Sequence, residues 1–255
     1  MQRVGVARST LYQMVASELR RAIYSGELRP GDALPTEVDL MRKSNVSRNT
    51  VRLALGELVN EGLISRTPRR GSVVRDRRPL LMYPQKELEP QPEGAGRQEA
   101  FARAVAQEGR KPGQEIEVSI VEPPEDVAIR LALPDDALAV VRRRLRYVDD
   151  QPYNTNDSYF PYGLVANSEI TRPADIIRGA NRVLEELGHP QVRVIDDISA
   201  RMPTSEEASR LKLEPGTPVV VYVRVGYDEE GMPVRVAVSV LPADKHLIRY
   251  ELERR

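Results

Sequence analysis

The chain has 255 residues, enough for one large domain or two of ordinary size. Its composition, 40% hydrophobic and 30% charged, is typical of a globular protein, and apolar runs such as 217–223 are too short to span a bilayer. The absence of cysteine excludes a disulfide framework, a thiol nucleophile and a zinc ribbon. The first residues lack the apolar core of a signal peptide, so we expect a cytoplasmic location.

The net charge of zero conceals an asymmetry along the chain. Residues 1–78 contain 15 basic and 8 acidic side chains, a net charge of +7, and residues 79–255 carry a net charge of −7. This division predicts that only the first part meets a polyanion. Chance segregation of surface charge is the alternative.

The first 76 residues contain three helical patterns and a hairpin. Apolar residues recur at helical spacing from Leu11 to Ile23, after Ser9 or Thr10 as N-cap. Thr36 and Asp39 form a capping pattern for a short helix over 37–43. Ser47 begins a third helix that extends to about Asn60, with Gly62 at the position after its C-cap. Two β-prone runs, 63–66 and 72–75, then flank the turn 67–71.

Residues 77–92 contain four prolines and are predicted to be an extended linker, within which 80–83 has the pattern of a strand. Beyond it, helices are predicted over 97–109, 124–133, 173–187 and 204–213. Six strands are predicted over 115–121, 138–148, 152–160, 191–200, 217–228 and 233–241. Because hairpin turns join most of these strands, we expect a two-domain α+β protein whose residues 93–255 form a largely antiparallel sheet with flanking helices.

Two helices, a tight turn and a following hairpin predict a winged helix-turn-helix over residues 1–76. The major groove of DNA admits one helix, whose first residues then face the base edges. In the third helix Ser47 is the predicted N-cap, and Val51 and Leu55 face the core. Arg48, the side chain best suited to guanine, would then face the groove with Asn49 and Thr50, and Arg52 would reach the DNA backbone. An ordinary capped and solvated helix start is the alternative.

The predicted turn of the hairpin is basic. Arg69 and Arg70 precede Gly71, and a glycine at the tip lets the backbone approach a minor groove whose negative potential suits arginine. A solvated loop is the alternative reading of this turn taken alone. Its position directly after a helix-turn-helix favours a DNA-binding wing.

The stretch 28–74 resembles the winged-helix domain of GntR-type bacterial transcription regulators. It shares with them the patterns PGDxLP, VSRxTVRxAL, LxxEGLI and RxGxxV. The resemblance implies DNA contacts by Arg48, Asn49, Thr50 and Gly71. With the residues singled out from the sequence itself, the candidate DNA-binding set is Thr36, Ser47, Arg48, Asn49, Thr50, Arg52, Arg69, Arg70 and Gly71. Val38 stands where the family has an arginine, which removes one DNA contact and implies an altered operator preference.

Residues 93–250 resemble the UTRA effector-binding domain of the HutC branch of those regulators, most closely over 138–161. The resemblance implies a fold like that of chorismate lyase, an antiparallel sheet that encloses a pocket for a small metabolite. It also implies a homodimer that releases its operator when the effector binds.

Strand alternation places Arg142, Arg144 and Arg146 on one face of their strand. The resemblance assigns Arg144 and Arg146 to an anionic effector, and guanidinium suits phosphate or carboxylate. Hydroxyl or amide contacts from Asn156, Ser158, Tyr159 and Ser239 complete the candidate set. An exposed basic face, or ion pairs to acidic helices, is the alternative. Asn156 replaces a glutamate of the family, and His246 replaces an aromatic residue. The identity of the effector therefore cannot be inferred from the effectors of the family.

The sequence contains no nucleophile elbow, phosphate loop or cluster of ligands at metal spacing, so we expect neither catalysis nor a metal or other cofactor. The sequence thus predicts a transcription regulator, with operator DNA and a small anionic metabolite as partners and no membrane association. A DNA-binding regulator without an effector is the principal alternative, and a chorismate-lyase-like enzyme is a further one.

Overall fold

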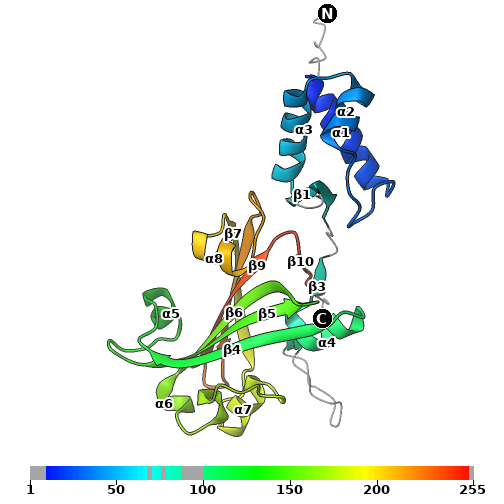
Figure 1. Cartoon of the computed structure of the whole chain (residues 1–255). Coiled ribbons are helices and arrows are strands. Elements are labelled where there is room, and N and C mark those ends of the chain that lie inside the picture. The colour runs from blue at the N-terminus through cyan, green and yellow to red at the C-terminus, as the bar shows by residue number, and fades with distance from the viewer. Residues whose placement is uncertain (1–9, 68–70, 76–78, 88–99, 253–255) are drawn as a thin grey trace, which may run out of the picture. The chain divides into compact units, whose positions relative to one another are not determined.

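The computed structural model describes residues 10–67, 71–75, 79–87 and 100–252. The chain divides into two compact units (Figure 1). Unit 1 comprises Met1–Arg78 with Glu214–Thr217, and unit 2 comprises Pro79–Leu213 with Pro218–Arg255. Among the described helices, none combines the length and apolar character needed to cross a membrane.

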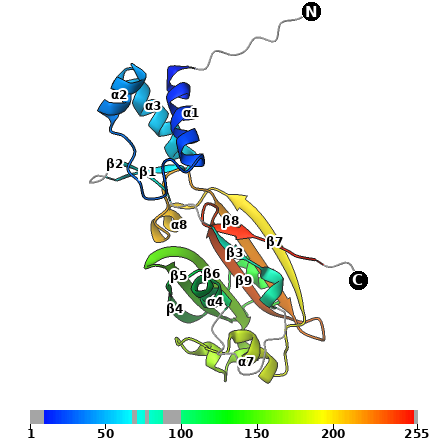
Figure 2. The ribbon, with the colours of Figure 1, turned by 90° about the vertical axis from the view of Figure 1, so that its right-hand side faces the viewer.

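Unit 1 is a three-helix domain with a hairpin (Figure 2). It consists of α1 (Leu11–Tyr24), α2 (Glu37–Ser44), α3 (Arg48–Asn60), β1 (Ile64–Thr67) and β2 (Gly71–Val74). The two strands pair antiparallel, from Ile64 opposite Val74 to Thr67 opposite Gly71. Apolar side chains of all three helices and the hairpin form one core, including Leu19, Leu40, Leu55, Leu58 and Val74. The predicted winged helix-turn-helix is therefore confirmed.

Local hydrogen bonds define the ends of these helices. Thr36 caps α2, because its hydroxyl accepts from the amide of Asp39 at 3.2 Å while the Asp39 carboxylate accepts from the amide of Thr36. Asn45 ends α2 in the left-handed conformation, which asparagine tolerates. The chain can thus turn within three residues from α2 into α3.

An ion cluster fixes the C-terminal half of α3 against α1. Nη2 of Arg20 on α1 lies 2.9 Å from the carboxylate of Glu57, and its guanidinium also bonds Glu61 at the end of α3. The hydrogen bonds that Arg20 donates to these carboxylates, above all to Glu61, raise the pKa of Arg20. Since the apolar face of α3 faces the core as well, the orientation of its first turn is held by the body of unit 1.

The described part of unit 2 contains one six-stranded antiparallel sheet in the order β4-β5-β6-β9-β8-β7. Its strands are β4 (Pro112–Val121), β5 (Ala139–Val148), β6 (Gln151–Pro161), β7 (Arg193–Arg201), β8 (Val219–Tyr227) and β9 (Pro233–Pro242). The β5–β6 turn places Asp149 and Asp150 at positive φ, as a tight hairpin requires. The α+β architecture predicted for this part of the chain is confirmed.

Short helices cover both faces of this sheet. On one face, α5 (Glu125–Arg130) and α8 (Ser205–Arg210) lie beside apolar clusters that contain Val127 and Leu211. On the other face, α6 (Tyr162–Val165), η2 (Glu169–Thr171) and α7 (Ala180–Glu186) pack at one end around Phe160 and Ile170. The opposite end of this second face is covered by α4 (Ala100–Gln107), which packs with Tyr153.

A parallel pair of short strands binds the start of unit 2 to its C-terminal segment. In it, β3 (Leu80–Met82) pairs with β10 (His246–Ile248), and η1 (Pro84–Glu87) follows β3. The hydroxyl of Tyr153 on β6 accepts from the amide of Leu80 at 3.1 Å and donates to the carbonyl of Lys245. Part of the stretch 77–92, expected to be a linker, therefore contributes a strand to unit 2.

The prediction of one helix over 173–187 was wrong for its first half. The helix α7 begins only at Ala180, after Gly179 at a φ of +81°. Within this half, the carbonyl of Ala174 accepts from the guanidinium of Arg142 on β5 at 2.7 Å, as do the carbonyls of Ile170 and Arg172 just before it at 2.9 and 2.7 Å. These carbonyls point at an arginine, so they do not close helical turns.

Arg142 is fully buried, and its replacement by leucine should destabilise unit 2. Arg142→Leu leaves the loop carbonyls without their donor, and we expect a loss of about 3 kcal/mol in the free energy of unfolding. Urea unfolding followed by circular dichroism measures this. Arg143→Leu, on the other face of β5 and half-exposed, is the matched control and should cost less than about 1 kcal/mol. Equal losses in the two variants would contradict the anchoring role of Arg142.

Candidate DNA-binding surface and effector site

The first turn of α3 is a capped helix end with exposed polar side chains. Ser47 is the N-cap, and its hydroxyl accepts from the amide of Thr50 at 3.2 Å. The Thr50 hydroxyl lies 2.9 Å from the Ser47 hydroxyl, which holds both side chains at the helix start. The remaining free amides and the helix dipole make such an end favourable for phosphate.

The exposed side of α3 carries the groups that the sequence assigned to DNA. Arg48, Asn49 and Arg52 are exposed, whereas Val51 and Leu55 are buried in the core of unit 1. Nε of Arg52 lies 3.7 Å from a carboxylate oxygen of Glu37. In such a solvent-accessible ion pair, a DNA phosphate could replace the carboxylate as the partner of Arg52. The geometry therefore presents Arg48 and Asn49 outward from a fixed helix end.

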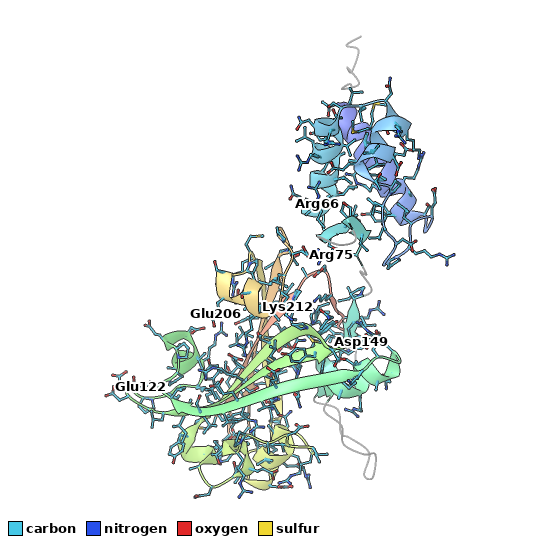
Figure 3. The ribbon with its side chains drawn as sticks, viewed as in Figure 1. Arg66, Arg75, Glu122, Asp149, Glu206 and Lys212 are labelled. Atoms are coloured by element: carbon cyan, nitrogen blue, oxygen red, sulfur yellow. The ribbon has the colours of Figure 1, made fainter. Side chains whose placement is uncertain are left out.

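The hairpin adds a cation that the sequence reasoning missed. Arg66 on β1 is exposed, lies beside α3 (Figure 3) and donates to the Arg52 carbonyl at 3.4 Å. Gly71 begins β2 at a φ of +69°, and a Cβ there would meet nothing within 4 Å, so the backbone is open to an approaching molecule. Arg69 and Arg70 lie outside the described residues.

Two positions on α2 bear on DNA reading. The hydroxyl of Thr36 is committed to Asp39, to whose carboxylate it donates at 2.6 Å. Val38 is 42% exposed, so the position at which the resemblance implies an arginine faces solvent without a polar group. Neither of these two side chains therefore offers an uncommitted polar group.

In unit 2, one face of the sheet carries a row of buried polar side chains between its two apolar ends. Strand register aligns Arg144 with Asn156 and aligns Asn156 with Ser239. We call the row the polar band; its members are Arg142, Arg144, Asn154, Asn156, Ser158, Arg224 and Ser239, each at most 7% exposed. Arg146 adjoins it, half-buried, with its guanidinium 4.9 Å from the Phe101 ring centroid.

Asn156 lies at the centre of the polar band. Its amide nitrogen donates to the Ser239 hydroxyl at 2.8 Å, and its amide oxygen accepts from Ser158 at 3.2 Å and from Arg144 at 3.5 Å. A buried amide with this many partners has a fixed orientation. The structure therefore brings together four of the predicted effector residues: Arg144, Asn156, Ser158 and Ser239.

Tyr159 does not join this group. Side chains alternate along β6, so Tyr159 points to the opposite face, where it packs with Val127, Leu131 and Val141. Ser158 is fully buried and its hydroxyl accepts from Arg235 at 3.0 Å, which makes it a support for Asn156.

A buried ion pair that sequence reasoning missed lies at the far end of the polar band. Arg224 on β8 bonds both carboxylate oxygens of Asp196 on β7 at 2.7 and 2.8 Å and donates to the carbonyl of Pro84 in η1 at 2.9 Å. Burial opposes the charge on Asp196, but hydrogen bonds from Arg224 and Tyr250 outweigh it and lower the pKa of this carboxyl. No local pattern predicts this pair, because Asp196 on β7 precedes Arg224 by 28 residues and only the sheet brings the two together.

His246 lies next to the polar band. Its Nδ1 lies 2.9 Å from the carbonyl of Pro242, its Nε2 lies 3.0 Å from the amide nitrogen of Asn154, and its ring lies 4.4 Å from that of Tyr153. Burial lowers the pKa of His246 to about 4, so the ring is neutral at physiological pH. The sequence marked His246 as a departure from the related domains without assigning it a contact.

Two protein-family models match this chain, one in each of its two units. The pattern of bacterial regulatory proteins of the gntR family matches residues 11–74, and the UTRA domain matches residues 107–246. The chain belongs to the GntR family of regulators that carry a UTRA domain. The resemblance found in the sequence is thereby confirmed for both parts of the chain.

Relatives are similar over nearly their whole length. The transcriptional regulator GgaR of Escherichia coli is 29% identical over 96% of this chain and 93% of its own. The transcriptional repressor NagR of Bacillus subtilis is 26% identical over 96% and 95%. The Mannosyl-D-glycerate transport/metabolism system repressor MngR of Escherichia coli is 28% identical over 87% of each chain.

Solved structures share the fold. A crystal structure of a GntR-family regulator superposes with a TM-score of 0.65 at 23% identity, over 97% of this chain and 99% of the other. PhnF from Mycobacterium smegmatis gives a TM-score of 0.57 at 23% identity, over 94% and 100%. Relatives and structural neighbours are thus regulators rather than enzymes, and this chain is a transcription regulator with a DNA-binding unit and a UTRA unit.

The lowered pKa of His246, which packs on Tyr153 and is only partly exposed, predicts a pH dependence of stability. A histidine has a pKa near 6.5 when unfolded, so between pH 6.5 and 4 the unfolded chain binds a proton that the folded chain does not. We expect this group alone to lower the free energy of unfolding by about 3 kcal/mol as pH falls through that window. Urea unfolding of the wild type and of His246→Phe at several pH values measures the difference. Parallel pH profiles for the two proteins would contradict a neutral His246 in the folded protein.

Proposed function

We propose that this protein is a cytoplasmic repressor that binds a short palindromic operator as a homodimer and releases it when a small anionic metabolite binds to unit 2. The observation that carries the proposal is the polar band, because buried guanidinium and amide groups aligned across a sheet suit recognition of a charged small molecule. Effector binding would shift the population of domain orientations, and linkage requires operator DNA to weaken effector binding by the same factor.

The DNA-binding half of the proposal rests on α3. Arg48 and Asn49 are exposed on a helix end whose other face is buried, with Arg66 and Gly71 on the adjoining hairpin. The names of NagR and MngR describe repressors, which supports repression by this chain. An operator with half-sites about 34 Å apart, one turn of DNA, suits a dimer of such domains.

Dimerisation through unit 2 is supported by its edge strand. β7 is the last strand of the sheet, and it exposes the apolar side chains of Ile195 and Ile198, with Met202 exposed just beyond it. Exposed edges with apolar side chains tend to be covered by another chain. A regulator that binds DNA but responds to no effector remains the alternative, and the effector experiments below separate the two.

A gel-shift assay with the promoter of the protein's own gene tests the function directly. We expect a retarded complex at low salt whose affinity falls steeply as salt rises, because phosphate contacts release counterions.

The variant Arg48→Ala tests the role of the first turn of α3 in the same assay. It should cost about 1–3 kcal/mol of binding free energy on that operator if Arg48 bonds a guanine. Equal losses on operator and random DNA would assign Arg48 to a phosphate, and no retardation at low salt would contradict the proposal.

Arg144→Ala tests the effector half. A thermal-shift screen of phosphorylated and carboxylated metabolites first identifies compounds that stabilise the wild type, since a ligand of the native state raises Tm. We expect Arg144→Ala to retain operator affinity but to be released by none of these compounds. Arg143→Ala, on the opposite face of β5, is the control and should respond as the wild type does. Normal release of Arg144→Ala would remove Arg144 from the effector site.

A further inference from the structure

Asn154 lies beside the proposed anion site, although sequence reasoning assigned it no role. It is 4% exposed, stands two residues before Asn156 on β6, and is aligned with Arg146 on β5. Its side chain therefore belongs to the face of the sheet that carries the polar band.

The amide of Asn154 has a defined orientation. The carbonyl of Pro242 can only accept, so Nδ1 of His246 carries the ring proton, and the neutral ring offers a lone pair at Nε2. The amide nitrogen of Asn154 donates to that lone pair at 3.0 Å. Reversing the amide would place two acceptors against each other, so Oδ1 points away from His246.

This amide oxygen is buried without a hydrogen-bond partner among the residues that the structure describes. Buried carbonyl oxygens nearly always have a donor, because a buried acceptor left unsatisfied destabilises the fold. The surroundings keep the group in place, since His246 packs on Tyr153 and begins β10, which pairs with β3. Such a fixed acceptor, with an arginine aligned across the strand pair, is suited to a ligand that supplies the missing donor.

We propose that Asn154 Oδ1 accepts a hydrogen bond from a hydroxyl group of the effector, a few bonds from the anionic group held by Arg144 and Arg146. This inference rests on the proposed function and narrows its effector to a hydroxylated anion. The shared chemistry includes phosphorylated polyols and hydroxycarboxylates. Asn154 thereby selects among anions that the arginines alone would bind alike.

Matched pairs of small anions test the proposal on the full-length protein. Glycerol 1-phosphate is compared with propyl phosphate, and glycerate with propionate, by isothermal titration calorimetry. A site built to bond a hydroxyl rejects the analogue that lacks it. We expect the hydroxylated member of at least one pair to bind about tenfold or more tightly, and the preferred pair distinguishes phosphate from carboxylate.

Two variants isolate the amide oxygen. His246→Phe preserves the ring on Tyr153 but removes the acceptor that orients the amide of Asn154, so it should weaken the preference for the hydroxylated member without abolishing it. The double variant Asn154→Leu with His246→Phe replaces both hydrogen-bonding partners by apolar groups, which is far less disruptive than leaving one unpaired. It should bind both members of the pair equally, with the affinity of the unhydroxylated member unchanged. Operator binding confirms that each variant is folded.

The outcomes separate this inference from the proposed function. Equal binding of both members by the wild type, or a preference that survives in the double variant, would overturn the role of Asn154 and leave the anion site at the arginines intact. Binding of none of the four anions by the wild type would overturn the anion site, and the inference with it.

Discussion

The structure of unit 2 depends on one constraint, that charged and amide groups buried on a sheet face must be hydrogen-bonded. Arg142 meets it by binding three loop carbonyls, and Arg224 meets it with Asp196 and Pro84. Between them, Asn156 bonds Arg144, Ser158 and Ser239. Since an unpaired buried charge is costly, these bonds determine which loops cover the sheet and where they lie.

The two ends of the polar band thus have different roles from its centre. At the ends, arginines organise the protein itself, because their partners are backbone carbonyls and a carboxylate of the same chain. At the centre, Arg144 and Asn156 are held by side chains whose hydroxyl groups can also contact a ligand. The segment that follows the DNA-binding unit is bound to this framework through β3, β10 and His246.

In unit 1 a single helix, α3, likewise has one part that holds it to the protein and another part that is exposed. The buried side of α3 and the bonds of Arg20 to Glu57 and Glu61 hold the helix, while its first turn remains exposed. Val38 offers no polar group on α2, whereas Arg48 and Asn49 are exposed at the start of α3. A rigid helix body with a small polar tip suits a site that must hold its geometry before it meets DNA.

The sequence by itself determined the features that depend on neighbours along the chain. The cap by Ser47, the apolar side of α3, the hairpins and the alternation of arginines on β5 all follow from local spacing, and they were enough to identify the family. Only the tertiary structure decided which side chains meet across distant strands. Arg142 became a structural anchor, Tyr159 turned to the opposite face, and Asp196, Asn154 and His246 joined the polar band and its surroundings. The physical reason is that hydrogen bonding of buried groups is satisfied in three dimensions, by partners whose separation along the chain carries no local signal.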